Sequence, residues 1–277
     1  MFSFLSDFFL KNGMDCIAPI PLNACTIRKP YLLERAGIFD GTVICVLIPY
    51  YTRCAETPDR NLSAYAVSGD YHLFWKQLSE QLLPRLSEKF PEHRFAAFAD
   101  HSPIDEIDAA AKAGLGVIGK NHLLLTEKYS SFVFLGEIIT DAVLPCRALE
   151  KIGTCDGCGA CLRACPAEKE HVLCLSALTQ KKGALTEDET KRLLKHPLLW
   201  GCDICQEVCP YTLRAKAAGT IYTAIPFFRE TAIPVLSLQT LDNMDDETFS
   251  SRAFSWRGRE TIRRNLLLHQ GKGDVSC

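Results

Sequence analysis

The sequence predicts an α+β fold, and three of its features support this class. The β-branched apolar run GTVICVLIPYY (residues 41–51) is typical of a buried strand, whereas apolar residues recur at helical spacing over 71–90. Eight of the 14 cysteines lie between Cys155 and Cys209. We therefore expect an N-terminal α+β domain over residues 1–150, a cysteine-rich domain over 151–215 and a short helical segment over 216–277.

Further elements are predicted on both sides of the cysteine-rich domain. Gly114 is expected to end a helix, because glycine adopts the left-handed conformation that helix ends often need. Pro84 is expected to kink or break the helix at 71–90, since it lacks a backbone N–H. The remaining expected elements are strands at 94–100, two strands around a polar turn within 122–140, and helices at 105–114, 245–254 and 259–270.

Composition limits the class of protein. A chain of 277 residues with 47% hydrophobic and 23% charged residues is ordinary for a globular protein, and its net charge of −2 argues against a generally basic nucleic-acid binder. No run approaches the roughly 20 apolar residues of a membrane helix. The N-terminal stretch MFSFLSDFFLKNGMD lacks the basic region of a signal peptide. We expect a cytoplasmic protein with no membrane association, in which abundant cysteines indicate metal or redox chemistry.

The cysteine spacing predicts two [4Fe–4S] clusters in a ferredoxin-like domain. The first run, CDGCGACLRACP, has the pattern C-x2-C-x2-C-x3-C-P, whereas the second, WGCDICQEVCP, has Leu199 where its first cysteine is due. In two-cluster ferredoxins the fourth cysteine of a run ligates the other cluster. Cys174, between the runs, then completes the set. The predicted ligands are Cys155, Cys158, Cys161 and Cys209 for one cluster, and Cys165, Cys174, Cys202 and Cys205 for the other.

Two alternatives bear on these cysteines. Structural zinc also uses C-x2-C pairs, but it needs neither a third cysteine at the same spacing nor the C-x3-C-P ending. A non-catalytic electron carrier could stop near the size of the ferredoxin-like domain, whereas about 150 residues precede it here. We therefore expect the clusters to feed a second redox centre or a substrate in the N-terminal domain.

Several motifs, in order, resemble the epoxyqueuosine reductase family. They are ADHSPIDEIDAAAKAGLGVIGKNHLLL (99–125), SFVFLGEIITD (131–141) and the cysteine pattern, flanked by SAYAVSGDYH (63–72) and WRGRETIRRN (256–265). The resemblance implies a cobalamin in a corrinoid- or nitroreductase-like α+β domain, beside the two clusters. It also implies reduction of the epoxide of epoxyqueuosine, in a tRNA anticodon stem-loop, to queuosine. An external low-potential electron donor would supply the electrons.

The resemblance assigns roles to individual residues. Asp100 corresponds to the family's proton donor, which the chemistry requires because an alkoxide is a poor leaving group; a lone Asp at a strand end is otherwise typical of a turn or N-cap. Lys120 and Glu137 are secondary candidates, with a structural salt bridge as the alternative. His72 and His122 are expected to be structural. The cofactor-binding residues implied are Asp100, Ser63, Asp105, Leu124, Leu135 and Leu178.

The glycines of AGLGVIGK (113–120) follow a predicted helix rather than a strand, which argues against a dinucleotide-binding loop. We interpret them as a tight turn that lets the backbone approach the corrin. In the tail, Arg252, Arg257, Arg259, Arg263 and Arg264 form a basic stretch able to contact tRNA phosphates, with a solvated basic helix as the alternative.

The sequence departs from the family pattern in several places. Ala64 and Ser68 replace a usual Arg and Gly, Val117 replaces an aromatic residue, and the chain ends at HQGKGDVSC where longer members continue into helical repeats. These departures leave open a related reductase that acts on a small molecule or on a corrinoid protein. We expect a monomer.

Overall fold

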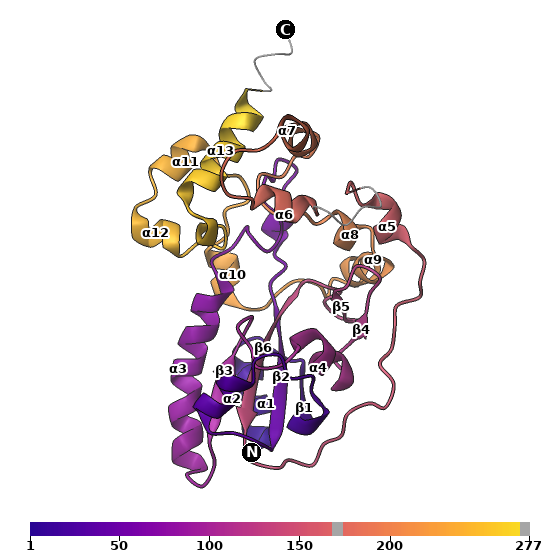
Figure 1. Cartoon of the computed structure of the whole chain (residues 1–277), viewed down its shortest axis with the longest axis vertical. Helices are drawn as coiled ribbons and strands as arrows, with labels where there is room; N and C mark the ends of the chain where they lie inside the picture. Colours follow the sequence, from indigo (N-terminus) through magenta and orange to yellow (C-terminus); the bar gives the residue numbers. More distant parts are fainter. Residues whose placement is uncertain (168–173, 272–277) are drawn as a thin grey trace. The chain divides into compact units, whose positions relative to one another are not determined.

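The structure is a computed structural model that describes residues 1–167 and 174–271 (Figure 1). The chain forms two compact units, each assembled from segments that are separated in the sequence. Unit 1 comprises Met1–Pro49, His72–Gly159 and Pro210–Ile225, and unit 2 comprises Tyr50–Tyr71, Ala160–Cys209 and Pro226–Cys277. The two units therefore interleave along the chain. The division into three consecutive domains, with boundaries at residues 150 and 215, stays a prediction.

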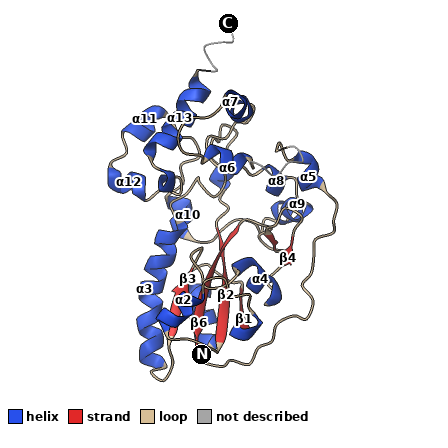
Figure 2. Cartoon of the chain, in the orientation of Figure 1, coloured by secondary structure: helices blue, strands red, loops and turns tan. Residues whose placement is uncertain are grey.

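Unit 1 is built on a four-stranded antiparallel sheet of order β1-β2-β6-β3 (Figure 2). Its central strand β2 is buried at all eight positions, as expected for a β-branched apolar run covered on both faces. The strands are β1 (Ile17–Pro21), β2 (Thr42–Pro49), β3 (Phe95–Phe98) and β6 (Val133–Thr140), and a small second sheet pairs β4 (Val117–Ile118) with β5 (Leu124–Leu125).

Helices pack on this sheet through small residues. The sheet side of α4 (Glu106–Lys112) is the buried run Ala109–Ala111, which joins the core formed with Val43 and Ile139. Gly136 in β6 allows Trp75 of α3 to lie against the strand, because a Cβ atom there would come within 2.7 Å of the indole ring. The helices of unit 1 are α1 (Phe2–Lys11), α2 (Pro30–Ala36), α3 (Tyr71–Lys89), α4 and α9 (Pro210–Ala217).

Unit 2 is helical, and its last helix ties its parts together. The Asn265 side chain, fully buried in α13, donates to the carbonyls of Thr179 and Leu199 at 2.7 and 2.8 Å. Trp200 and Phe254 lie in the same apolar core. The helices are α5 (Ala160–Ala164), α6 (Leu175–Thr179), α7 (Glu187–Leu194), α8 (Ile204–Glu207), α10 (Pro226–Glu230), α11 (Leu238–Asp242), α12 (Asp246–Ser250) and α13 (Arg259–Gln270).

A buried ion pair connects the segment after β2 to the second cysteine run. Arg60 donates to Asp203 at 2.6 Å and to Glu207 at 2.8 Å, and the side chains of Arg60 and Asp203 are 9% and 2% exposed. The same Asp203 oxygen accepts the backbone N–H of Ala64 at 2.7 Å. These bonds satisfy charges that would be costly to bury alone.

The predicted α+β class is confirmed, and the main strands and helices form where their patterns indicated. Pro84 lies inside a continuous α3, so the break weighed for it is wrong. Within 122–140 the two predicted strands form as β5 and β6, on either side of a turn in which Thr126 and Ser130 are hydrogen-bonded, and β5 pairs with β4. No helix in residues 1–167 and 174–271 has both the length and the apolar character to cross a membrane.

Replacing Asp203 by alanine should strongly destabilise the fold. The change leaves the Arg60 guanidinium buried without its main partner, so the free energy of unfolding should fall by about 3–5 kcal/mol, as measured by denaturant unfolding without oxygen. In the exposed Lys191–Glu187 pair, by contrast, Glu187→Ala should cost about 0.5 kcal/mol or less. Equal losses in the two variants would contradict this role for the buried pair.

Candidate active site and cluster ligands

Asp100 presents an exposed carboxylate from a strained turn directly after β3. Its φ is 60°, in the left-handed region that costs non-glycine residues of order 1–3 kcal/mol and recurs at active sites. The side chain is 74% exposed, and its Oδ2 lies 3.7 Å from His72 Nε2. Its backbone N–H donates to Glu106 Oε1 at 2.9 Å. The residue is thus not an N-cap, and its carboxylate is available to a reacting group.

The loop that follows Asp100 is anchored at both ends by residues from the start of the chain. The His101 ring contacts Lys29 Nζ at 3.1 Å and Tyr31 Oη at 3.0 Å. Asp105 caps α4 and also accepts the Arg28 guanidinium at 2.8 Å. Burial opposes ionisation of Asp105, but the bonds from Arg28 and from the α4 backbone outweigh it and lower its pKa. Asp105 therefore serves the loop structurally.

A buried acid, Glu137, and a half-buried one, Glu106, form a pair behind this loop. Glu137 on β6 is 2% exposed, and its carboxyl group interacts with Ser102 and Glu106. Burial, and then the neighbouring Glu106 carboxylate, raise the pKa of Glu137 well above its usual value. Burial also raises the pKa of Glu106, which faces the Lys29 ammonium, but its bonds from Asp100 and Glu137 favour the ionised form. We assign the proton of the pair to Glu137, as donor to Glu106.

This arrangement corrects one alternative from the sequence. Glu137 does not form the structural salt bridge weighed for it, because its described neighbours are an acid and a hydroxyl. Lys120 likewise has no ion pair among the described residues; its Nζ lies 3.9 Å from the position a Cβ would take on Gly157, in the first cysteine run. His72 Nε2 lies 3.7 Å from the Asp100 carboxylate, and the structural role expected for His72 stays a prediction.

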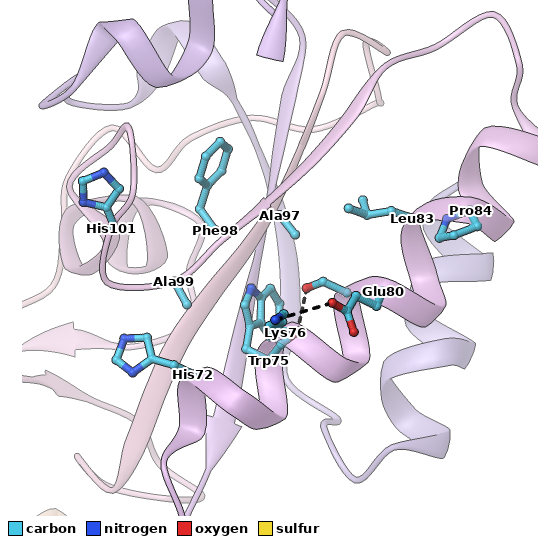
Figure 3. A pocket seen from close by; sticks show the side chains of 11 residues that line it. His72, Trp75, Lys76, Glu80, Leu83, Pro84, Ala97, Phe98, Ala99 and His101 are labelled. Carbon is cyan, nitrogen blue, oxygen red and sulfur yellow. Dashed lines mark hydrogen bonds and ion pairs between the residues drawn. The ribbon is translucent and has the colours of Figure 1, made fainter. Parts of the chain in front are cut away.

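A groove of about 580 Å³ lies between α3 and the end of β3 (Figure 3). Trp75, Leu83 and Phe98 give it an apolar wall, and the Lys76–Glu80 pair lies at its side with 3.9 Å between the charged atoms. His72 and His101 stand at the end nearest Asp100, which lies in the chain between the lining residues Ala99 and His101. An apolar group seated there would have a carboxylic acid close by.

The other residues implied to bind the cofactor are mostly buried. In unit 1, Leu124 is 4% exposed in β5 and Leu135 is half-buried in β6. In unit 2, Ser63 and Leu178 are fully buried. The Ser63 Oγ packs against Gly201 and interacts with the Tyr65 hydroxyl, without a hydrogen bond of ordinary geometry among the described residues.

The glycine turn approaches protein backbone in this structure. A Cβ on Gly116 would lie 2.5 Å from the Leu125 carbonyl oxygen, so the glycine is required by the β4–β5 pairing itself. The interpretation of this turn as a corrin contact remains a prediction.

The cysteine runs meet where α5 packs against α8. Cys161 lies in α5 and Cys205 in α8, so these helices bring residues from both runs together within unit 2, as predicted. Gly157 and Gly159 both adopt φ of 72°, which lets the chain between Cys155 and Cys161 turn sharply.

The second predicted ligand set lies wholly in unit 2. Cys165 follows α5, Cys174 is the exposed N-cap of α6, and Cys202 precedes α8. The thirteen cysteines of the described residues are not joined in disulfides. In residues 1–167 and 174–271, no three Cys, His, Asp or Glu side chains converge on one metal-ion position. The division of the eight cysteines between two clusters therefore stays a prediction.

The basic tail is largely used by the fold, which corrects an expectation. Arg252 is 4% exposed and donates to the carbonyls of Thr231 and Val67. Arg259 binds the Leu241 and Met244 carbonyls, Arg263 pairs with Asp242, and Arg264 binds the Lys181 and Gly183 carbonyls. The fifth arginine, Arg257, stacks on the exposed Trp256 ring, with its Cζ atom 3.7 Å from the ring centroid. Four of the five guanidinium groups thus serve internal contacts.

Known proteins were compared with the chain. The family described as "4Fe-4S double cluster binding domain" matches residues 154–212, which supports two [4Fe–4S] clusters in this segment and not zinc. An epoxyqueuosine reductase from Aliivibrio fischeri is 32% identical over 98% of this chain and 72% of that protein. The chain belongs to the epoxyqueuosine reductase family. A family member from Listeria monocytogenes is also 32% identical, over 82% of this chain.

Solved epoxyqueuosine reductases share the fold. The enzyme from Streptococcus thermophilus matches all of this chain and 82% of its own with a TM-score of 0.77 at 21% identity. An epoxyqueuosine reductase crystallised with an epoxyqueuosine-modified tRNA stem loop matches 99% of this chain with a TM-score of 0.76. The chain spans 63% of the length of the Listeria family member.

The buried acid pair predicts a pH-dependent stability difference. Because the folded-state pKa of Glu137 is raised, the folded chain binds the proton more tightly, and the free energy of unfolding falls as pH rises from the unfolded-state pKa towards the folded one. Glu137→Gln removes this loss. Its stability relative to wild type should therefore increase above about pH 4.3, by up to about 1.4 kcal/mol per pH unit.

Urea unfolding across this pH range would measure the effect. The exposed Glu88→Gln variant is the control, and its difference from wild type should stay constant with pH. A constant difference for Glu137→Gln as well would contradict the protonated state assigned to the pair.

Proposed function

We propose that this protein reduces the epoxide of epoxyqueuosine in tRNA to queuosine, with Asp100 as the proton donor. The observation that carries the proposal is the exposed Asp100 carboxylate, held in a left-handed turn by Glu106, in a chain of this family. A related enzyme bound to an epoxyqueuosine-modified tRNA stem loop supports the substrate. The proton on Asp100 would go to the oxygen released when the epoxide ring opens.

Cobalamin is part of this proposal. When bound, it would supply a strongly nucleophilic cobalt centre for attack on the epoxide-bearing ring. The half-buried Leu135 offers the cofactor an apolar contact, and the buried Ser63 hydroxyl is a second contact that the family resemblance implies. The residues proposed for corrin binding are Asp100, Leu124 and Leu135 of unit 1 and, from the family resemblance, Ser63 and Leu178 of unit 2; the Asp105 carboxylate, also implied, binds Arg28.

The two clusters would pass electrons from an external low-potential donor. Thiolates that accept N–H hydrogen bonds suit iron–sulfur clusters, and the Cys202 thiol accepts one from the Ile204 backbone. The proposed ligands remain Cys155, Cys158, Cys161 and Cys209 for one cluster and Cys165, Cys174, Cys202 and Cys205 for the other. A cytoplasmic monomer with reduced thiols completes the proposal.

One observation favours a second candidate, a reductase of a small molecule or of a corrinoid protein with the same cofactors. Four of the five tail arginines expected to meet tRNA phosphates are engaged within the fold. Loss of the tRNA reaction, with clusters and cobalamin both bound, would favour this candidate.

Asp100→Asn should abolish most activity without altering the cofactors. The amide cannot release a proton to the epoxide oxygen, so turnover of an epoxyqueuosine-modified stem loop by anaerobically reconstituted protein should fall about 10²–10⁴-fold, as measured by mass spectrometry. Cobalamin binding and iron content should match wild type. The exposed Asp59→Asn is the control, and comparable turnover in the two variants would reject Asp100 as the acid.

Cys174→Ser should affect one cluster only. Cys174 is proposed to replace the cysteine missing at Leu199, so iron content should fall from about eight towards about four per chain, or one cluster should convert to a three-iron form, as seen by electron paramagnetic resonance. Cys54→Ser, at a half-buried cysteine of the same unit, should keep both clusters. Wild-type iron content in Cys174→Ser would refute the ligand assignment.

A further inference from the structure

His196 lies buried beside the second cysteine run. It follows α7, in the stretch that leads to Cys202, and is 7% exposed. Its Nδ1 accepts the backbone N–H of Leu198 at 3.1 Å, and its Nε2 lies 3.7 Å from Cys202 Sγ. Both ring nitrogens therefore face protein groups.

The backbone contact decides which nitrogen carries the hydrogen. A nitrogen that accepts an N–H bond has no proton of its own, so Nδ1 is unprotonated and the ring is neutral. The single ring hydrogen then lies on Nε2, which points at the Cys202 sulfur. The geometry makes Nε2–H a donor to this sulfur.

We propose that the Nε2–H group of His196 donates a hydrogen bond to the Cys202 thiolate and raises the reduction potential of the cluster that Cys202 ligates. This inference rests on the proposed ligand role of Cys202. A donor to a ligating sulfur withdraws negative charge and stabilises the reduced, more negative cluster. His196 is a positioning residue for the ligand, since it does not touch substrate.

The surroundings of Cys202 support this role. The Ile204 backbone N–H also bonds the Cys202 thiol, so a main-chain and a side-chain donor meet at one sulfur. The Arg60–Asp203 pair fixes the residue next to Cys202, which keeps the sulfur in place beside the ring. A histidine needed only for the turn at Leu198 would have no reason to direct its donor at a cysteine.

The test is a redox titration followed by electron paramagnetic resonance on the anaerobically reconstituted full chain, without cobalamin or tRNA. His196→Asn keeps a side-chain acceptor suited to an N–H two residues later, but it is too short to reach Cys202. His196→Ala removes both contacts. In both variants the equilibrium constant for reduction of one cluster should fall about tenfold, which lowers its reduction potential by about 59 mV for a one-electron couple. The potential of the other cluster should stay unchanged.

Further variants separate this inference from the proposed function. His93→Asn, in unit 1, is the control and should leave both potentials unchanged. Unchanged potentials in His196→Asn and His196→Ala would overturn the inference, as would retention of both clusters in Cys202→Ser. If the wild-type protein does not turn over modified tRNA but the His196 variants show the predicted shift in potential, the proposed tRNA reaction is wrong and the role of His196 at the cluster is supported.

Discussion

The buried pair between Arg60 and Asp203 constrains the redox part of this molecule. Asp203 sits between Cys202 and Ile204, and it binds both the Arg60 guanidinium and the Ala64 N–H. Moving either buried side chain out of this pair would cost free energy of folding, because it would leave the other charge buried without a partner. The pair thus fixes the cysteine loop with respect to the segment after β2, and the contacts of Cys202 follow from it.

Unit 1 uses the same principle with acids instead of an ion pair. Glu106 accepts hydrogen bonds from the Asp100 N–H and from the Glu137 carboxyl group, so a half-buried carboxylate holds the backbone of an exposed residue. The left-handed backbone of Asp100 would be costly alone, and the anchored loop compensates for it. In unit 1 the Asp100 side chain is accessible, while Glu137, which bonds the group that positions it, is buried.

Local patterns in the sequence predicted much of this. Apolar periodicity gave β2 and α3, and the cysteine spacing gave the double cluster segment. Contacts between distant residues were beyond such patterns: Tyr31 meets His101 seventy residues later, and no local signal links His196 to Cys202. In the tail, a local pattern suggested a function that the contacts do not favour. The run of arginines suggested a phosphate-binding surface, but guanidinium groups such as those of Arg252 and Arg259 bind backbone carbonyls within the fold.

The interleaved segments have a consequence for biosynthesis. Residues 210–225 complete unit 1, where Thr212 bonds the Ser130 hydroxyl, and α13 near the end of the chain holds the peptide carbonyls of Thr179 and Leu199. Unit 2 cannot close before α13 has been synthesised, whereas unit 1 needs no residue after Ile225. A cluster held by the cysteines of a folded unit 2 must therefore be inserted after α13 has been made, and until then the cysteine loop at Cys202 lacks the helix that closes its unit.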